Sequence, residues 1–152
     1  MTEIGVIADT HKLLRPEAAA YLQGCELIIH AGDIGSQGII ATLEQIAPVI
    51  AIRGNIDKRS WADAYPCTES VEVENRRIYV LHNARELDLD PSEAGFDVVI
   101  SGHSHKPQIR REDGVLYLNP GSAGPRRFTL PIAVARLRLT CNVIDARIIE
   151  IG

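Results

Sequence analysis

The chain of 152 residues is 45% hydrophobic and 24% charged, which is typical of one globular domain and excludes a disordered or fibrous protein. Twenty acidic residues against sixteen basic ones give a net charge of −4, which argues against a general binder of nucleic acid or membrane surfaces. Thirteen of the sixteen basic residues are arginine, whose planar guanidinium is suited to bidentate contacts with phosphate.

The first half of the chain alternates short apolar runs with helical patterns. Pro16 opens the first helical pattern at a position where proline is tolerated, and apolar residues between Ile39 and Ile46 recur at helical spacing in the second. Runs that are apolar on both faces and joined by helices indicate a parallel sheet covered on both sides. The predicted elements are a strand at 3–8, a helix at 15–23, a strand at 26–30, a helix at 37–46 and a strand at 48–52.

The second half is rich in predicted strands, and helical patterns nearly vanish after residue 95. An α/β first half followed by a β-rich second half predicts a four-layer α/β/β/α sandwich, in which two mixed β-sheets are flanked by helices. No internal repeat or linker divides the chain, so we expect residues 1–152 to form a single domain. A turn is predicted at 75–76 and another at the Glu-Asp-Gly sequence of 112–114. The predicted strands are 70–74, 77–82, 96–101, 109–111, 115–118, 132–139 and 143–151.

The cysteines and the N-terminal segment favour a cytoplasmic protein. Cys25, Cys67 and Cys141 are few, odd in number and widely spaced, which is typical of neither a disulfide framework nor a thiolate metal site. Asp9 interrupts the N-terminal segment before the apolar stretch of a signal peptide develops, and no apolar run approaches the ~20 residues of a membrane helix. We therefore expect a cytoplasmic protein without a membrane segment.

Five of the apolar runs end in residues that are able to bind a metal. In an α/β sheet the ligand crevice lies beyond the carboxyl ends of the strands, where adjacent loops converge. Side chains that are far apart in the sequence are therefore expected to meet in one cleft. The strand-end residues are Asp9, His11, Asp33, Asn55, His82, His103 and His105.

Taken one at a time, these residues have ordinary structural explanations. Asp is common as a capping residue in the turn after a strand, and Gly-Asp or Gly-Asn turns are usually structural. His103 and His105 are a stronger signal, because a spacing of two places both imidazoles on one face of an extended segment. The joint pattern decides in favour of a functional site, since four of the five histidines follow strands, together with Asp or Asn at three other strand ends.

The set of oxygen and nitrogen ligands is too large for one tetrahedral zinc and suits two ions with five or six ligands each. The absence of cysteine from the set favours manganese, with iron, zinc, nickel or cobalt as alternatives. Two carboxylates against two divalent ions leave a net charge of about +2, which lowers the pKa of a bridging water and holds a phosphate oxygen for in-line attack.

These residues fall into five blocks: Asp9-x-His11, Gly32-Asp33, Gly54-Asn55-x-Asp57, His82 and Gly102-His103-Ser104-His105. In order and spacing the blocks resemble those of the calcineurin-like metallophosphoesterases. The resemblance runs from residue 4 to about 127 and is nearest to the small bacterial and archaeal phosphodiesterases, which also carry an Asn-Pro-Gly-Ser block like 119–122. It implies a two-sheet sandwich, a hydrolase with two divalent ions, and a metal-bridging hydroxide as the nucleophile.

The resemblance also assigns roles to the ligands. Asp33 is implied to bridge the two ions, and geometry permits this, because a carboxylate has two anionic oxygens able to span ions ~3.5–4 Å apart. Asn55 and the histidines, His82 among them, are implied to face the phosphoryl oxygens of the substrate as well. The implied sets are Asp9, His11 and His105 for one metal and Asn55, His82 and His103 for the other.

Two positions depart from the family pattern. Many larger members carry a His directly after the Asn of the third block, where it is thought to protonate the leaving group, whereas this chain has Ile56. A hydrocarbon side chain cannot donate a proton, so leaving-group catalysis from this position is absent. The family usually has Gly after the fourth-block His, and this chain has Asn83, which tolerates the left-handed backbone that such a Gly often requires.

Four further features each have two interpretations. His30 lies within a strand and is expected to be a packed residue that supports the ligands, rather than a ligand itself. Asp57 either orients a metal ligand, which we favour, or closes a turn. Arg126 and Arg127 form either a phosphate clamp or a solvated pair, and 119–122 is either a tight turn or part of the site.

We expect a metal-dependent phosphodiesterase that acts on small phosphate esters. The alternative from another class is a non-catalytic metal-binding interaction scaffold of the same fold, although all the ligand positions keep competent side chains. A nuclease or a nucleotide-binding sensor would need basic or aromatic stacking surfaces, and the net charge of −4 with 5% aromatic residues argues against a long nucleic-acid substrate. The two C-terminal strands offer an edge for pairing with another subunit, in a dimer or a tetramer.

Overall fold

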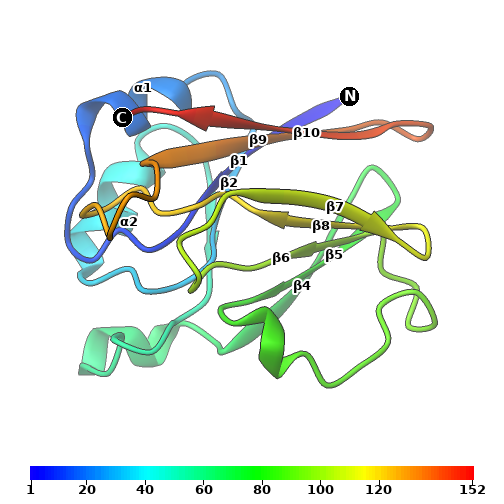
Figure 1. The fold of residues 1–152 in the computed structure, drawn as a ribbon, viewed down its shortest axis with the longest axis horizontal. Helices are drawn as coiled ribbons and strands as arrows, with labels where there is room; N and C mark the ends of the chain where they lie inside the picture. The colour runs from blue at the N-terminus through cyan, green and yellow to red at the C-terminus, as the bar shows by residue number, and fades with distance from the viewer.

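The computed structural model describes residues 1–152 and contains two five-stranded β-sheets (Figure 1). In order across the sheet, sheet A consists of β10 (Ile144–Glu150), β9 (Ala133–Leu139), β1 (Thr2–Ile7), β2 (Leu27–His30) and β3 (Val49–Ala51). Sheet B consists of β4 (Thr68–Val73), β5 (Arg76–Leu81), β6 (Val98–Ile100), β8 (Val115–Asn119) and β7 (Gln108–Glu112).

The strands that lead to the predicted ligands are parallel neighbours in both sheets. In sheet A, β1, β2 and β3 pair in parallel, with Ile7 opposite His30 and His30 opposite Ala51. In sheet B, β5 and β6 pair in parallel, with Val80 opposite Ile100. Parallel neighbours end at the same edge of a sheet, so the loops after β1, β2 and β3 emerge together, as do the loops after β5 and β6.

The main core lies between the two sheets. Their inner faces contribute branched aliphatic side chains, such as Ile4 and Ile29 from sheet A and Ile78 and Leu118 from sheet B, which are almost completely buried. Full burial of a side chain of this size contributes about 1.5–3 kcal/mol. This packing holds the sheets face to face and thereby fixes the relative positions of the loops at their edges.

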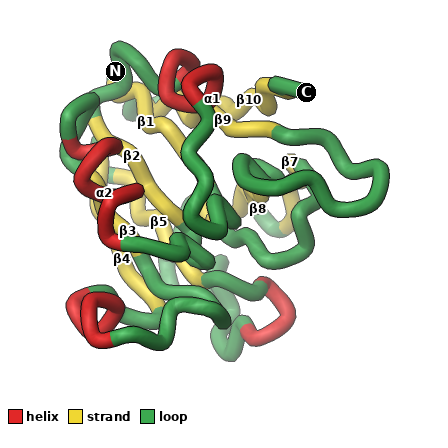
Figure 2. The backbone as a smooth tube through the Cα atoms, turned by 90° about the vertical axis from the view of Figure 1, so that its left-hand side faces the viewer, coloured by secondary structure: helices red, strands yellow, loops and turns green.

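Both α-helices, α1 (Pro16–Tyr21) and α2 (Gln37–Glu44), lie on the sheet A side of the molecule (Figures 1 and 2). They bury aliphatic side chains such as Leu43 against its outer face. Neither helix has the length and apolar character needed to cross a membrane. The outer face of sheet B carries the short 3₁₀ turn Ala84–Glu86 and a loop whose Leu87 packs on it. The predicted sandwich of two mixed sheets is confirmed, with a thinner outer layer over sheet B than over sheet A.

Several element boundaries differ from the predicted ones for local reasons. The second helix ends at Glu44 instead of residue 46, shortly before Pro48, which disfavours a helical residue in front of it. The first hairpin turn lies at Glu74–Asn75, one residue earlier than predicted, where φ angles of 55° and 61° are those of a tight hairpin turn. The 3₁₀ segments Ser60–Ala64 and Ala84–Glu86 were not predicted, because turns this short carry no periodic signal.

Candidate metal centre

Five of the predicted ligands meet where loops from both sheets converge. Asp9 and His11 follow β1, and Asp33 follows β2. His82 follows β5, and His105 follows β6. The cluster therefore draws on both sheets, and its geometry depends on how their inner faces pack together.

The carboxylates of the cluster lie between the imidazoles. The Asp33 Oδ2 atom lies 3.4 Å from His11 Nε2 and 3.2 Å from His82 Nε2. The Asp9 Oδ1 atom lies 3.9 Å from His11 Nε2 and 3.8 Å from His82 Nε2, and its distance to His105 Nε2 is 3.7 Å. Two groups have ligand atoms within 4.8 Å of one another: Asp9, His11 and His105, and Asp9, Asp33 and His82. The first group is the set predicted for one metal, whereas the second places both carboxylates beside His82.

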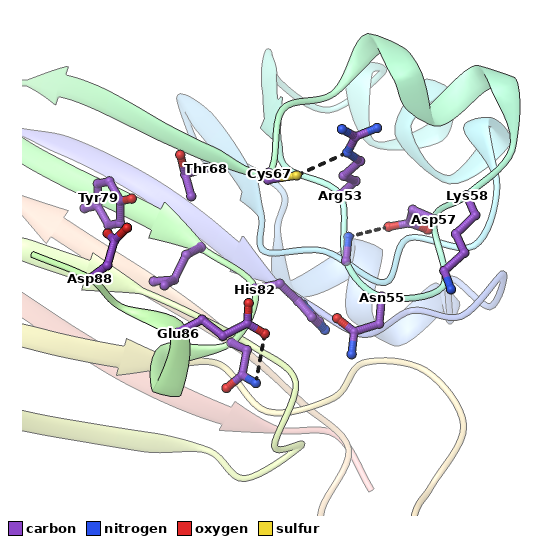
Figure 3. Close-up of a pocket in the computed structure, with 13 residues that line it drawn as sticks. Arg53, Asn55, Asp57, Lys58, Cys67, Thr68, Tyr79, His82, Glu86 and Asp88 are labelled. Atoms are coloured by element: carbon purple, nitrogen blue, oxygen red, sulfur yellow. Dashed lines mark hydrogen bonds between the residues drawn. The ribbon is translucent and has the colours of Figure 1, made fainter.

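The other two predicted ligands flank this cluster. The His103 ring lies edge-on to the His82 ring with centroids 5.2 Å apart, and the His103 backbone N–H donates to Asp9 Oδ2 at 3.1 Å. Asn55 and His82 line the same open cleft (Figure 3). All the predicted ligands thus border one region of the molecule, and their binding of metal stays a prediction.

Four side-chain atoms of the cluster are buried and have no hydrogen-bond partner: Asp9 Oδ1, His11 Nε2, His82 Nε2 and His105 Nδ1. An unpaired buried polar atom costs about 1–3 kcal/mol, so a native protein seldom keeps several of them together without a use. His82 Nδ1 hydrogen-bonds to the carbonyl oxygen of Ala31 at 2.7 Å, which leaves the Nε2 atom to face the carboxylates. Carboxylate oxygens and imidazole nitrogens arranged in this way fit divalent cations such as manganese, iron or zinc.

Burial and mutual charge shift the pKa values of the cluster. Burial raises the pKa of the Asp9 carboxyl to about 7. Burial also acts to raise the pKa of Asp33, but the nearby His82 imidazole, the Ile56 N–H and His11 together outweigh burial and bring the pKa down to about 2. Burial opposes the charged form of His82, but the Asp33 and Asp9 carboxylates and the Ala31 carbonyl oxygen together outweigh burial and raise the pKa of this imidazole. Asp9 therefore keeps a proton below neutral pH, and a cation that binds there must displace it.

Five of the predicted ligands have a backbone conformation that residues other than glycine rarely adopt. This left-handed conformation costs about 1–2 kcal/mol per residue, and it persists only where the surrounding contacts impose it. Its concentration in one place favours a functional site. The φ angles are 56° at Asp9, 47° at His11, 55° at Asp33, 70° at His103 and 64° at His105.

His30 joins the loops after β1 and β2 from inside the core. It is fully buried, and burial lowers its pKa to about 3, so the ring is neutral. Its Nδ1 atom accepts the backbone N–H of Gly32 at 3.1 Å, so Nε2 carries the proton and donates to the Thr10 hydroxyl at 3.0 Å. That hydroxyl donates in turn to the Ile34 carbonyl oxygen at 2.7 Å. His30 therefore contacts the loops that carry the cluster, without being a member of either ligand group.

Asp57 joins the loops after β2 and β3 in a similar way. Its carboxylate is 2% exposed and accepts three backbone N–H groups, from Ile34 at 3.0 Å, Gly35 at 2.9 Å and Gly54 at 2.9 Å. A Cβ atom on Gly54 would overlap the Asp33 carboxylate, so only glycine permits this close approach of the two loops. The contacts of Asp57 support its interpretation as a residue that positions a ligand.

The segment 119–122, for which the sequence left open a tight turn or a part of the site, connects the loops after β1 and β6. The Asn119 side-chain amide donates to the Gly102 carbonyl oxygen at 2.9 Å and to Ser104 Oγ at 3.1 Å. The Ser122 hydroxyl donates to the Asp9 carbonyl oxygen at 3.1 Å. These contacts support the interpretation of 119–122 as part of the site. Thr10 is a further positioning residue, which the sequence alone did not identify.

The two departures from the family pattern lie beside the cluster. Ile56 is 46% exposed, and its backbone N–H donates to Asp33 Oδ1 at 3.1 Å. Asn83 does not use the left-handed backbone that it could tolerate, because its φ angle is −116°. The chain enters the 3₁₀ turn Ala84–Glu86 there, and the Asn83 side-chain oxygen accepts the Arg85 N–H at 3.1 Å. Asn83 is therefore a capping residue.

Two large clefts adjoin the cluster. One has a volume of about 660 Å³ and is bordered by Asn55 and His82, with Tyr79 further along its wall (Figure 3). The other has a volume of about 640 Å³ and is bordered by His103 and Lys106. Small-molecule sites typically have volumes of this order, so the cluster has room beside it for the organic groups of a small ester.

A smaller cavity, of about 210 Å³, adjoins His11 and His105 and reaches Arg126 and Arg127. Burial lowers the pKa of His105 to about 4, and the positive charge of Arg127 acts in the same direction. Burial likewise lowers the pKa of His11, and the Arg127 charge again contributes. The Arg127 guanidinium is therefore close enough to the cluster to influence the charge of these imidazoles.

Two mixed sheets packed face to face, with carboxylates and imidazoles gathered at their strand ends, define the metallophosphoesterase class. The sequence pattern of the calcineurin-like phosphoesterase superfamily domain matches residues 2–142. The chain therefore belongs to this superfamily, a family of metal-dependent phosphoester hydrolases, and the predicted resemblance is confirmed.

Individual relatives agree with this assignment. The chain is 39% identical over 161 residues to a probable metallophosphoesterase of Methanothermobacter thermautotrophicus, and the match covers 98% of this chain and 92% of the relative. A solved archaeal phosphodiesterase is 25% identical with a TM-score of 0.80, and the match covers 97% of this chain and 99% of that one. Vacuolar protein sorting 29 from Cryptosporidium parvum has a TM-score of 0.84 at 19% identity, covering 99% of this chain and 92% of that one. This last likeness shows the shared fold alone.

Proposed function

We propose that the protein is a phosphodiesterase that hydrolyses small phosphate diesters at a centre of two divalent metal ions. One observation carries this proposal: Asp9 and Asp33 are buried together at distances of 3.2–3.9 Å from imidazole nitrogens, and several of the facing atoms have no hydrogen-bond partner. The relationship to a solved archaeal phosphodiesterase supports the diester as substrate class.

The proposed centre has seven protein ligands, and manganese is the favoured metal, with iron, zinc, nickel and cobalt as alternatives. Two divalent ions held by these residues would supply Lewis-acid chemistry: they would lower the pKa of a bound water, which would make it a nucleophile towards phosphorus, and would offset the charge of the phosphoryl oxygens. The Asp33 carboxylate reaches towards both His11 and His82, and we assign to it the bridging position. The remaining ligands are Asp9, His11 and His105 for one ion and Asn55, His82 and His103 for the other.

Residues of the chain itself would orient the phosphoryl group. The Asn55 amide can donate a hydrogen bond to a phosphoryl oxygen, and Asn55 borders the same cleft as His82. His82 is fixed in orientation by its hydrogen bond to Ala31. Ile56 next to Asn55 has no proton to donate, so a leaving group must depart without help from this position. This favours esters whose leaving group is a weak base, such as a phenol.

The cleft beside Asn55 and His82 favours a small substrate. Its lining mixes positive side chains, Arg53 and Lys58, with acidic ones, and Tyr79 is its one aromatic residue apart from the His82 ring. A long single-stranded nucleic acid needs a basic groove with a series of aromatic side chains for stacking. The lining therefore supports a compact ester over a polymer.

The test is hydrolysis of an aryl phosphodiester by metal-loaded protein, with metal content measured on the same samples. We expect activity that is lost on chelation, restored by a divalent cation, and lost in Asp33→Asn. The control is Asp145→Asn, which changes the same chemical group at an exposed position on the edge strand β10. Hydrolysis that survives both chelation and the Asp33 substitution would contradict the proposal.

A non-catalytic interaction scaffold is the second candidate, and the likeness of the fold to vacuolar protein sorting 29 favours it. Such a scaffold would bind metal and hydrolyse no phosphate ester, so the same experiment separates the two. The edge strand β10 suits a homo-oligomer, dimer or tetramer, since no strand of the chain pairs with its outer side. Free thiols at Cys67 and Cys141 are exposed, which fits a reducing cytoplasm.

A further inference from the structure

We propose that the cavity beside His11 and His105 binds a second phosphate group of the substrate, with Arg127 as its main contact. The inference rests on the proposed function and narrows it to a substrate class, namely phosphodiesters that carry a further phosphate. The cavity lining contains two imidazoles, two guanidiniums and Pro125, with neither a carboxylate nor a hydrophobic side chain. Such a lining repels cations, offers little to an apolar group and attracts an anion.

Arg127 is the cation in this cavity that is free to bind a ligand. Arg127 is exposed, and its guanidinium makes no hydrogen bond or ion pair within the protein, whereas other arginines do. The neighbouring Arg126 instead donates to the Leu130 carbonyl oxygen at 3.2 Å. A guanidinium presents a planar fork of N–H donors that matches two oxygens of a phosphate.

The segment that leads to Arg127 is fastened to the loop that carries Asp9. The backbone N–H of Ala123 donates to the Ala8 carbonyl oxygen at 3.0 Å. A Cβ atom on Gly124 would overlap the Asp9 carbonyl oxygen, so the two segments are in direct backbone contact. The backbone that leads to Arg127 is therefore held against the cluster, and this places Arg127 at the wall of the cavity.

Charge favours a second phosphate over the scissile one as the partner of Arg127. Two divalent ions and the guanidiniums of Arg126 and Arg127, set against the carboxylates of Asp9 and Asp33, the hydroxide nucleophile and a singly charged diester, leave an excess of about two positive charges. A terminal phosphate carries about −1.5 to −2 at neutral pH and would offset this excess. The volume of 210 Å³ is about seven times the ~30 Å³ share of one water, which leaves room for a phosphate with part of its hydration.

The experiment compares two substrates that differ only in the second phosphate: thymidine 5′-(p-nitrophenyl phosphate) with and without a 3′-phosphate. In Arg127→Gln we expect kcat/KM for the 3′-phosphorylated substrate to fall about tenfold, and that for the other substrate to change by less than about twofold. Arg147→Gln is the matched control, because it removes the same charge at an exposed position on β10. We expect it to change both values by less than about twofold.

Calorimetric titration provides a second measurement that does not depend on turnover. Thymidine 3′,5′-bisphosphate should bind the wild-type protein more tightly than thymidine 5′-monophosphate, and Arg127→Gln should weaken the bisphosphate alone, by about tenfold. Equal losses for both substrates in Arg127→Gln would place Arg127 on the scissile phosphate and overturn the inference. So would a wild-type protein that binds both nucleotides equally while it hydrolyses both esters. A protein that takes up no metal and hydrolyses neither ester would refute the proposed function instead, and the titration would still decide the role of Arg127.

Discussion

Replacement of Asp57 by alanine tests whether a residue behind the cluster holds two of its loops together. The carboxylate is 2% exposed and accepts the backbone N–H groups of Ile34, Gly35 and Gly54. Each buried donor that loses its acceptor costs about 1–3 kcal/mol. The bonds from Gly35 and Gly54 are only partly buried, so water can replace them in part, and we expect a loss of about 3 kcal/mol in the free energy of unfolding.

Thermal and urea unfolding of the metal-free protein measure this loss. For a chain of this size, about 3 kcal/mol corresponds to a decrease of about 6–12 °C in Tm. Asp57→Asn keeps one acceptor oxygen, and because Ile34 and Gly54 both donate to Oδ2, it can retain those two bonds and should lose about half as much. Asp145→Ala, at an exposed position on β10, should change stability by no more than about 0.5 kcal/mol.

Metal affinity should fall together with stability in Asp57→Ala, because the same hydrogen bonds hold the loop of Asp33 against the loop of Asn55. Metal uptake by the folded variant is measured at a temperature well below its Tm. A variant that unfolds like the wild type and takes up the same amount of metal would refute the view that Asp57 positions the site.

Three further outcomes are expected. Asp33→Asn should lose more activity and more bound metal than His11→Ala, because a bridging carboxylate anchors both ions, whereas water can replace one neutral imidazole. Similar losses in the two variants would argue against Asp33 as the bridging ligand. Metal affinity, measured by titration at constant ionic strength, should rise with pH up to about 7 and then level off. Burial raises the pKa of the Asp9 carboxyl to about 7, so protons compete with the metal below that pH. An affinity that is independent of pH below 7 would contradict this expectation. Aryl diesters should turn over about 10²–10⁴ times faster than matched alkyl monoesters, because Ile56 cannot protonate a leaving group. Ile56→His should reduce this difference in rate. Equal rates in the unmodified protein would mean that another residue protonates the leaving group.

The cluster was predictable from the sequence because strand ends in an α/β sheet converge by topology. Parallel pairing of β1 with β2 brings Asp9 and Asp33 to one edge of sheet A, and parallel pairing of β5 with β6 does the same for His82 and His105 in sheet B. The packing of the two sheets then joins these pairs in one cluster. The layered fold was predictable for a similar reason, since runs apolar on both faces must be covered on both sides.

The surroundings of the cluster were not predictable, because they depend on contacts between segments far apart in the chain. The hydrogen bond from Ser122 to the Asp9 carbonyl oxygen joins residues 113 positions apart, and nothing in either local sequence indicates it. Asn83 shows the same limit, since its extended backbone follows from a 3₁₀ turn that has no periodic pattern. The nearness of Arg127 to His105 likewise depends on tertiary packing.

The measurement that tests the central claim most directly is the number of divalent ions bound per chain, determined by elemental analysis after manganese loading and removal of free metal. The account predicts two ions per chain in the wild type, far fewer in Asp33→Asn, and two again in Asp145→Asn. A wild-type protein that stays metal-free, or that holds a single ion, under these conditions would contradict a centre of two metals formed by the strand-end carboxylates and imidazoles.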